Sequence, residues 1–289
     1  MSKVYTIMFW FSVALVLAAI AVLFTYGLNL GVDFIGGSVM EVNLVERPPL
    51  NDMRKMLTEA GFAEISINYT GDDGVLIRTK ELTEEEHQNI LAVLENNFSG
   101  IDEKRFDSIG PVIGNELKIK SAIAIMLALL GIIIYIAIVF RKLTTTLSPW
   151  TMGLAAITAL LHDVLVPLGV FALLGHFYGV EISAVFVAAV LTILGYSVSD
   201  SVVIFDRVRE NIVKENSSPF SQIVHRSIMQ TLTRSLNTTF TTLLSLFAIY
   251  FFGGESIRYF ALALIVGIFL GAYSSIFVAA PLLVWWSRK

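Results

Sequence analysis

Residues 121–142 read SAIAIMLALLGIIIYIAIVFRK. The first 20 of them carry no charge, and two basic residues follow at once. A helix needs about 20 mostly apolar residues to cross a bilayer, so this stretch predicts a membrane span. Hydrophobic residues make up 55% of the 289-residue chain and charged residues only 15%. That balance excludes a single soluble globular domain, because such a chain could not cover its surface with polar side chains.

The same criterion indicates five further spans, so we expect a polytopic α-helical membrane protein with six transmembrane helices. The predicted spans are 4–26, 119–140, 150–174, 183–205, 231–252 and 257–286. The first is expected to be retained, because no convincing small-residue cleavage site follows its apolar core. The predicted domains are therefore a first transmembrane helix at 1–26, a polar domain at 27–118 and a five-helix membrane bundle at 119–289.

Lysine and arginine in the short loops indicate how these spans face. The loops 175–182 and 253–256 carry no basic residue. Arg258 lies just past the second of these loops. The termini and short loops of the opposite side carry nine basic residues: Lys3, Arg141, Lys142, Arg207, Arg209, Lys214, Arg226, Arg288 and Lys289. Basic loops stay in the cytoplasm, so both termini are expected there, and the domain at 27–118 is expected outside it.

The domain at 27–118 alternates apolar and polar residues in short runs separated by helical patterns. Strands are expected at 33–45, 65–68, 75–79 and 103–109, and helices at 51–60 and 84–97. This order is βαββαβ, so we expect an extracytoplasmic α+β domain of the ferredoxin-like type. The domain holds 17 acidic and 8 basic residues, a balance that argues against nucleic-acid binding. Its acidic run at 84–86 is either a partner site or a solvated first helical turn.

Asp200 and Arg234 are the ionisable residues that predict a function, because charges within membrane helices are costly and usually face a bundle interior or water. Ser197 and Ser201 share a helical face with Asp200, and Arg234 precedes a polar face on the next span that continues through Asn237 and Thr238. Both faces enter from the same side of the membrane, so we expect them to meet. The pair is either a carboxylate that exchanges a proton beside a fixed positive charge or a neutralised structural ion pair.

His162 and Asp163 lie in the middle of the third predicted span. Successive helical residues point about 100° apart, so the two are not expected to share one small site. His162 is either a ligand or proton relay, or a residue that hydrogen-bonds a neighbouring helix. Asp163 is either a functional carboxylate or a second structural one.

The chain has no cysteine, which excludes disulfides, cysteine-based metal sites and thiol catalysis. No GxSxG or HExxH motif is present either. We therefore expect no catalytic site, no metal site and no cofactor, and we do not expect an enzyme.

Five ordered motifs occur at fitting positions: GVDFIGG at 31–37, IGPVIGNEL at 109–117, LHDV at 161–164, GYSVSDSVVIFDRVREN at 195–211 and RSLNTTFTTL at 234–243. Together they resemble the SecF family of the bacterial SecDF complex, within the resistance–nodulation–division superfamily. The resemblance covers nearly the whole chain. Family members commonly carry more polar residues before the first span, so the chain is expected to be trimmed or to belong to a fused SecDF.

The resemblance implies partners and a mechanism that composition does not show. It implies pairing with SecD, contact with YajC and the SecYEG channel, and use of a proton or sodium gradient to help draw preproteins across the bacterial inner membrane. It implies ion coupling by Asp200 and Arg234. The residues Gly31, Asp33, Gly36 and Gly37 match the GxDFxGG motif, which is expected at the junction of helix and domain.

Two other functions were weighed against this one. An exporter of lipid or small molecules from the same superfamily generally has twelve spans and two large external domains, whereas this chain has six predicted spans and one domain. An intramembrane enzyme would need a nucleophile with a base, or metal ligands, on facing helices. Only His162 lies well inside a span as such a group.

The topology leads to a first prediction. We expect Glu85→Cys and a single cysteine placed in the 207–226 loop to react with a membrane-impermeant thiol reagent from opposite sides of the membrane. The native chain has no cysteine, so it supplies its own unlabelled control. Labelling of both positions from the same side would contradict the topology.

Overall fold

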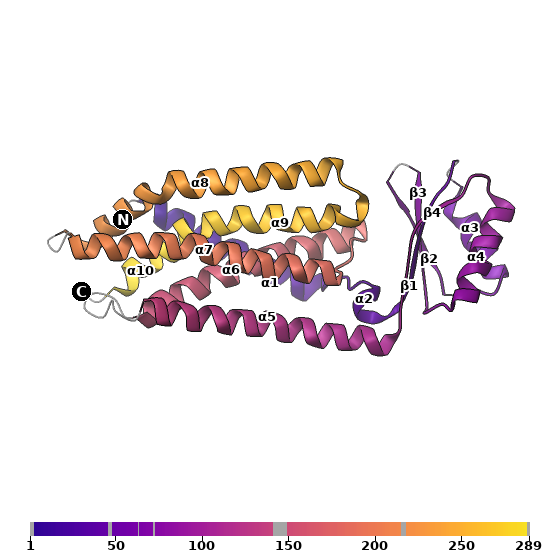
Figure 1. The fold of residues 1–289 in the computed structure, drawn as a ribbon, viewed down its shortest axis with the longest axis horizontal. Coiled ribbons are helices and arrows are strands. Elements are labelled where there is room, and N and C mark those ends of the chain that lie inside the picture. The colour runs from indigo at the N-terminus through magenta and orange to yellow at the C-terminus, as the bar shows by residue number, and fades with distance from the viewer. Residues whose placement is uncertain are drawn as a thin grey trace. The chain divides into compact units, whose positions relative to one another are not determined.

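The computed structural model describes residues 3–45, 48–62, 64–71, 73–140, 149–214 and 218–287. The chain divides into two compact units (Figure 1). One unit combines residues 1–29 with residues 123–289, and the other consists of residues 30–122. The predicted division at 27–118 therefore differs from the observed one by a few residues at each end.

Among the described residues, six helices are long and apolar enough to cross a membrane, in agreement with the six predicted spans. The first five are α1 (Lys3–Tyr26), α5 (Pro111–Val139), α6 (Pro149–Tyr178), α7 (Ala184–Lys214) and α8 (Phe220–Phe252). The last is built from α9 (Glu255–Ser274), a π-helix η1 (Ser275–Ala279) and α10 (Ala280–Trp286). Several of these helices extend well beyond the apolar stretch, and α5 and α8 begin before the residues at which a span was predicted.

The π-helix in the last span has a local cause. Pro281 has no backbone N–H and so cannot donate to the carbonyl one turn earlier. The preceding turn widens, and the N–H of Ala280 donates to the carbonyl of Ser275 instead of the one four residues back. Such single-turn bulges occur often at functional sites.

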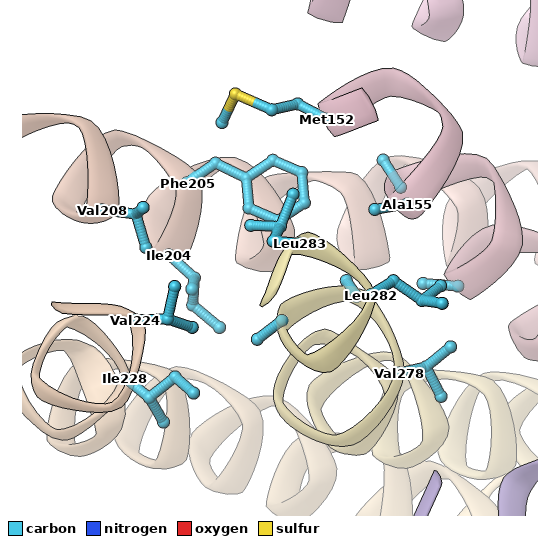
Figure 2. Close-up of a cluster of buried hydrophobic side chains, with 14 of the residues drawn as sticks. Met152, Ala155, Ile204, Phe205, Val208, Val224, Ile228, Val278, Leu282 and Leu283 are labelled. Carbon is cyan, nitrogen blue, oxygen red and sulfur yellow. The ribbon is translucent and has the colours of Figure 1, made fainter. Parts of the chain in front are cut away.

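The helices α6, α7 and α9 form the centre of the bundle, while α5 and α8 run along its edges (Figure 1). Around the ends of α6 and α7, close-packed apolar side chains fill the space between helices (Figure 2). Phe140 and Phe205 meet edge to face there, with ring centroids 6.0 Å apart. The other contributors include Met152, Ala155, Ile204, Val208, Val224, Ile228, Val278, Leu282 and Leu283.

Small residues allow the helices to approach closely. A Cβ atom added to Gly169 of α6 would lie 2.8 Å from the Cα atom of Ala19 in α1. Gly267 and Gly271 of the last span, four residues apart in a GxxxG pattern, act in the same way, because added Cβ atoms there would lie 2.2 Å from Ile193 and 3.1 Å from Ser197. Backbones in contact gain van der Waals attraction, which holds membrane helices together where lipid tails are as apolar as the side chains.

The unit at 30–122 contains a four-stranded sheet in the order β2-β3-β1-β4, with all neighbouring strands antiparallel. Its strands are β1 (Gly37–Asn43), β2 (Ser66–Thr70), β3 (Gly74–Thr79) and β4 (Asp102–Ile109). Its helices are α2 (Val32–Ile35), α3 (Leu50–Glu59) and α4 (Glu84–Asn97). The strand predicted from residue 33 was wrong at its start, because residues 32–35 form a helical turn that the two glycines after it end.

The helix α4 matches its predicted bounds, and its capping box is present. The Thr83 hydroxyl accepts from the N–H of Glu86, and the Glu86 carboxylate accepts from the N–H of Thr83. These hydrogen bonds hold the pKa of Glu86 below its usual range. The helix buries Ile90 and Leu94 in the core, with Met53 and Leu57 of α3. Glu86 of the acidic run at 84–86 therefore serves the helix start.

The contact between α1 and α6 gives a second prediction. Gly169→Ala places a methyl group 2.6 Å from the Cβ atom of Ala19, so the helices must separate, at a cost of about 1–3 kcal/mol. Gly131→Ala is the matched control, since nothing lies within 4 Å of its added Cβ atom. It should stabilise α5 by up to about 1 kcal/mol. The free energy of unfolding of the full chain in detergent measures both effects. A change of the same sign in the two variants would contradict the close packing of α1 against α6.

Candidate functional site

A fully buried carboxylate lies at the centre of the bundle. Asp163 of α6 has an exposed fraction of 0%. Its Oδ2 atom accepts from the Ser197 hydroxyl of α7 at 2.5 Å and from the Ser274 hydroxyl of α9 at 2.6 Å. A buried charge is costly unless it is hydrogen-bonded, and these donors meet that need. Three helices are therefore tied together at one atom.

His162 takes part in the same site, so the expectation that it would not was wrong. Its Nδ1 atom lies 2.9 Å from Oδ1 of Asp163. Although the two Cα–Cβ bonds point about 100° apart, both side chains are long enough to turn back toward each other. The ring of His162 stacks on Tyr273 with a centroid distance of 6.0 Å. The Tyr273 hydroxyl donates to the carbonyl of Met8 in α1, which joins a fourth helix to the site.

Asp200 lies on α7 in a more open environment. It is only partly buried, and the described contacts give it one hydrogen-bond donor, the hydroxyl of Ser235 in α8. The two serines expected beside it bond elsewhere: Ser197 donates to Asp163, and Ser201 pairs with Ser275 at 2.8 Å. Ser197 and Ser201 point toward α9 and the π-helix η1, because α7 packs against α9 and η1 along the face that carries these serines.

Arg234 begins a polar stripe on α8 whose members are all exposed in this chain: Arg234, Asn237, Thr238, Thr241 and Ser245. Thr238 and Thr241 donate back to carbonyls of their own helix at 2.9 Å. Arg234 directly precedes Ser235, whose hydroxyl donates to Asp200. Within the described residues, however, no ion pair joins the two. The two polar faces that were expected to meet therefore do so only in part: Ser235 of α8 bonds to Asp200 of α7, but the described residues show no ion pair between Arg234 and Asp200.

Three serines that contact the carboxylates or their helices were missed by sequence reasoning: Ser235, Ser274 and Ser275. A serine inside an apolar span has no sequence feature that separates a ligand from a small packing residue. Ser274 ends α9 and Ser275 begins the π-helix. Two hydroxyls in succession within a span are the one signal that was available. Across the described residues, no group of three or more His, Cys, Asp or Glu side chains is arranged so that it could hold a metal ion.

Comparison with known proteins places this arrangement in a family. Residues 89–289 match the family described as "Protein export membrane protein SecD/SecF, C-terminal", and residues 21–44 match the "SecD/SecF GG Motif". The protein translocase subunit SecF of Thermobaculum terrenum is 42% identical, over 96% of this chain and 90% of that protein. The chain belongs to the SecF family of protein translocase subunits. Like the SecF proteins, it is a multi-pass membrane protein.

Solved structures agree with the SecF assignment. The crystal structure of SecDF, a translocon-associated membrane protein from Thermus thermophilus, is 35% identical, with a TM-score of 0.86. That match covers 98% of this chain and 38% of the SecDF chain, so the present chain spans well under half of that protein. A SecF subunit from Anaerolinea thermophila is 36% identical over 96% of this chain and 91% of its own length.

The SecF family's double glycine has a clear structural basis here. Gly36 and Gly37 have φ values of +79° and +127°, which residues with a side chain rarely adopt. A Cβ atom on Gly36 would also lie 2.6 Å from the Cα atom of Pro111, at the start of α5. One on Gly37 would lie 2.7 Å from the carbonyl oxygen of Thr79. The motif thus lets the turn between α2 and β1 pack directly against two other backbones.

The buried carboxylate gives a third prediction. Ser197→Ala removes a hydrogen bond to a charged group, so we expect it to destabilise the folded chain by about 1.5–3 kcal/mol. The matched control is Ser201→Ala, one helical turn away, which removes only a bond between neutral hydroxyls, worth about 0.6 kcal/mol. The free energy of unfolding in mixed micelles distinguishes them. An equal loss of unfolding free energy in the two variants would show that the hydrogen bond from Ser197 to the carboxylate contributes no more than a bond between neutral hydroxyls.

Proposed function

We propose that this chain, paired with a SecD-type subunit, uses the proton or sodium gradient to help draw preproteins through the SecYEG channel, with YajC as a further partner. Membership of the SecF family supports the transport role. The similarity to SecDF supports pairing, because this chain corresponds to 38% of a protein that holds both parts in one polypeptide. No bond chemistry is needed in this role, since the work is done by conformational change, and we therefore assign no enzymatic activity.

Asp200 is the residue that we assign to ion coupling. A gradient does work only if some group changes its proton occupancy between two access states. Asp163 is closed in by three hydrogen-bonding partners, whereas Asp200 is only partly buried and has one hydroxyl donor. This difference in enclosure is the observation that carries the proposal. A carboxylate that keeps a free side within a membrane helix can lose and regain a proton without breaking a packed core.

Arg234 tunes this exchange in our proposal. An arginine keeps its charge at every accessible pH, so it acts as a fixed positive group. When it lies close to Asp200 it favours the charged carboxylate, and when it is withdrawn it favours protonation, because an unpaired buried charge is costly. Movement of α8 relative to α7 is thereby tied to proton binding. The absence of an ion pair between them among the described residues fits an arginine that is free to move.

The exposed stripe on α8 is proposed as the face that meets the SecD-type subunit. Polar and charged groups rarely face hydrocarbon and usually face a bundle interior. Asn237 and Thr238 continue the stripe from Arg234 along the outer side of this chain. A second set of membrane helices on this face would enclose Asp200 and Arg234 and would provide the remaining hydrogen-bond partners.

The unit at 30–122 is proposed to be an extracytoplasmic ferredoxin-like domain in the bacterial inner membrane protein. Its helices and strands follow each other as β1, α3, β2, β3, α4 and β4, and its sheet order β2-β3-β1-β4 fits that arrangement. The placement outside the cytoplasm, with both chain termini inside, rests on the distribution of basic loops.

Asp200→Asn tests the coupling role, because the amide keeps the shape of the side chain and cannot titrate. Inverted membrane vesicles that contain the SecD-type subunit and the Sec channel should import a preprotein with and without an ionophore. We expect normal assembly, and import reduced to the level that the ionophore leaves in the native complex. Asp206→Asn is the matched control, since Asp206 lies on the same helix with 69% of its side chain exposed. It should respond normally to the gradient.

Normal abundance together with normal gradient-dependent import in Asp200→Asn would rule out the coupling role. A purely structural role predicts a different result, namely lower abundance or weaker association with the SecD-type subunit, and a normal gradient response of whatever complex remains. An exporter of lipid or small molecules would show no effect on preprotein import in either variant.

A further inference from the structure

A second ionisable site lies deeper in the bundle than Asp200 and does not depend on the proposed coupling role. His162 has an exposed fraction of 3%, and its Nδ1 atom lies 2.9 Å from Oδ1 of Asp163. Because the other carboxylate oxygen already accepts from Ser197 and Ser274, the carboxylate is acting as an acceptor throughout. An ionised carboxylate only accepts hydrogen bonds, so with Asp163 ionised the proton between Nδ1 and Oδ1 belongs to Nδ1, and this sets the tautomer of the ring.

The second ring nitrogen has no such partner. Nε2 of His162 is buried and accepts or donates no hydrogen bond within the described residues. With Nδ1 protonated, the neutral ring carries its lone pair on Nε2. Buried polar atoms in proteins are almost always hydrogen-bonded, so an unpartnered basic nitrogen within a membrane bundle calls for an explanation.

The charges around the pair favour proton uptake. A neutral ring leaves the pair with the single negative charge of Asp163, and no lysine or arginine in the described structure forms an ion pair with it. Of the titratable groups on the elements packed against α6, Tyr273 of α9 contacts the ring of His162. Several others have contacts away from the pair: Asp200 with Ser235, Tyr5 with His225, Tyr26 with His176, Tyr196 with Thr239 and Arg258 with Tyr250. The elements η1 and α10 contain no titratable residue.

We propose that Nε2 of His162 is a proton-binding site inside the bundle, and that Asp163 is its positioning residue. A proton from water adds to the lone pair of Nε2, no other bond breaks, and Nδ1 keeps its proton. The pair passes from a net charge of −1 to 0, which removes an uncompensated charge from a medium of low dielectric constant. Asp163 stays ionised and balances the imidazolium, in the way that a carboxylate orients a histidine in many proton-transfer sites.

The backbone around the site is adapted for small movements. Pro167 has no N–H to donate to the carbonyl of Asp163, so the hydrogen-bond ladder of α6 is interrupted at this residue. On the facing helix, Ser274 donates to Asp163 directly before the π-helix begins. Interrupted ladders on both sides let the helices adjust when the charge of the pair changes, without loss of regular helix elsewhere.

Nitrogen NMR on the full chain in lipid nanodiscs tests the site, with 15N-labelled histidine and His162→Gln to assign the signal. As the pH falls from about 10 to about 4, we expect the signal of Nε2 of His162 to change from unprotonated to protonated. Nδ1 should remain protonated over the whole range. In Asp163→Asn the midpoint should move to lower pH, because the balancing charge is gone. His225, which bonds to Tyr5 and contacts no carboxylate among the described residues, should keep its midpoint in this variant.

Three results would overturn the proposal. The first is a His162 signal that does not change over the whole range, and the second is a ring with the proton on Nε2 and none on Nδ1. The third is a midpoint that is the same in Asp163→Asn as in the native chain. The first two concern the native protein alone, so they decide the question even if Asp163→Asn does not fold. None of these measurements needs a membrane gradient or a partner, so their outcome is separate from that of the Asp200 experiment.

Discussion

A charge inside a bilayer has to find its partners within the protein, because hydrocarbon provides no hydrogen bonds. The bundle depends on this constraint at Asp163. Ser197 of α7, Ser274 of α9 and the adjacent His162 converge on its carboxylate. A helix that turned about its axis or slid by one residue would lose its donor, so the rotation and the register of three helices are set together at this point.

Close approach of the helices is a condition for that convergence. Gly271 lets α9 lie directly against α7, since a Cβ atom there would come within 3.1 Å of Ser197 and 3.7 Å of Oδ2 of Asp163. Larger residues at this position would move the serines away from the carboxylate. The small residues of α9 therefore serve the polar site as much as the packing, and the GxxxG spacing and the buried aspartate belong to one structural arrangement.

The two membrane aspartates differ in how fully the chain encloses them. Asp163 has all its neighbours within one chain and holds the helices in place. Asp200 has one hydroxyl partner, a partly open side and a nearby arginine on an exposed polar stripe. In our proposal a partner subunit completes the site at Asp200, and this would give the chain a physical reason to work within a larger membrane assembly.

Local properties of the sequence determined the six spans, the capped helix at 84–97 and the order of strands and helices in the polar unit. Hydropathy, capping and turn chemistry act over a few neighbouring residues, so they can be read without knowing the fold. The tertiary structure alone decided that His162 and Asp163 share a site, that Ser197 and Ser201 turn away from Asp200, and that Ser235 and Ser274 are donors. Helical periodicity states which residues share a face, but not which helix covers that face. That choice depends on the packing of backbones far apart in the chain, where a glycine such as Gly271 decides how closely two helices approach.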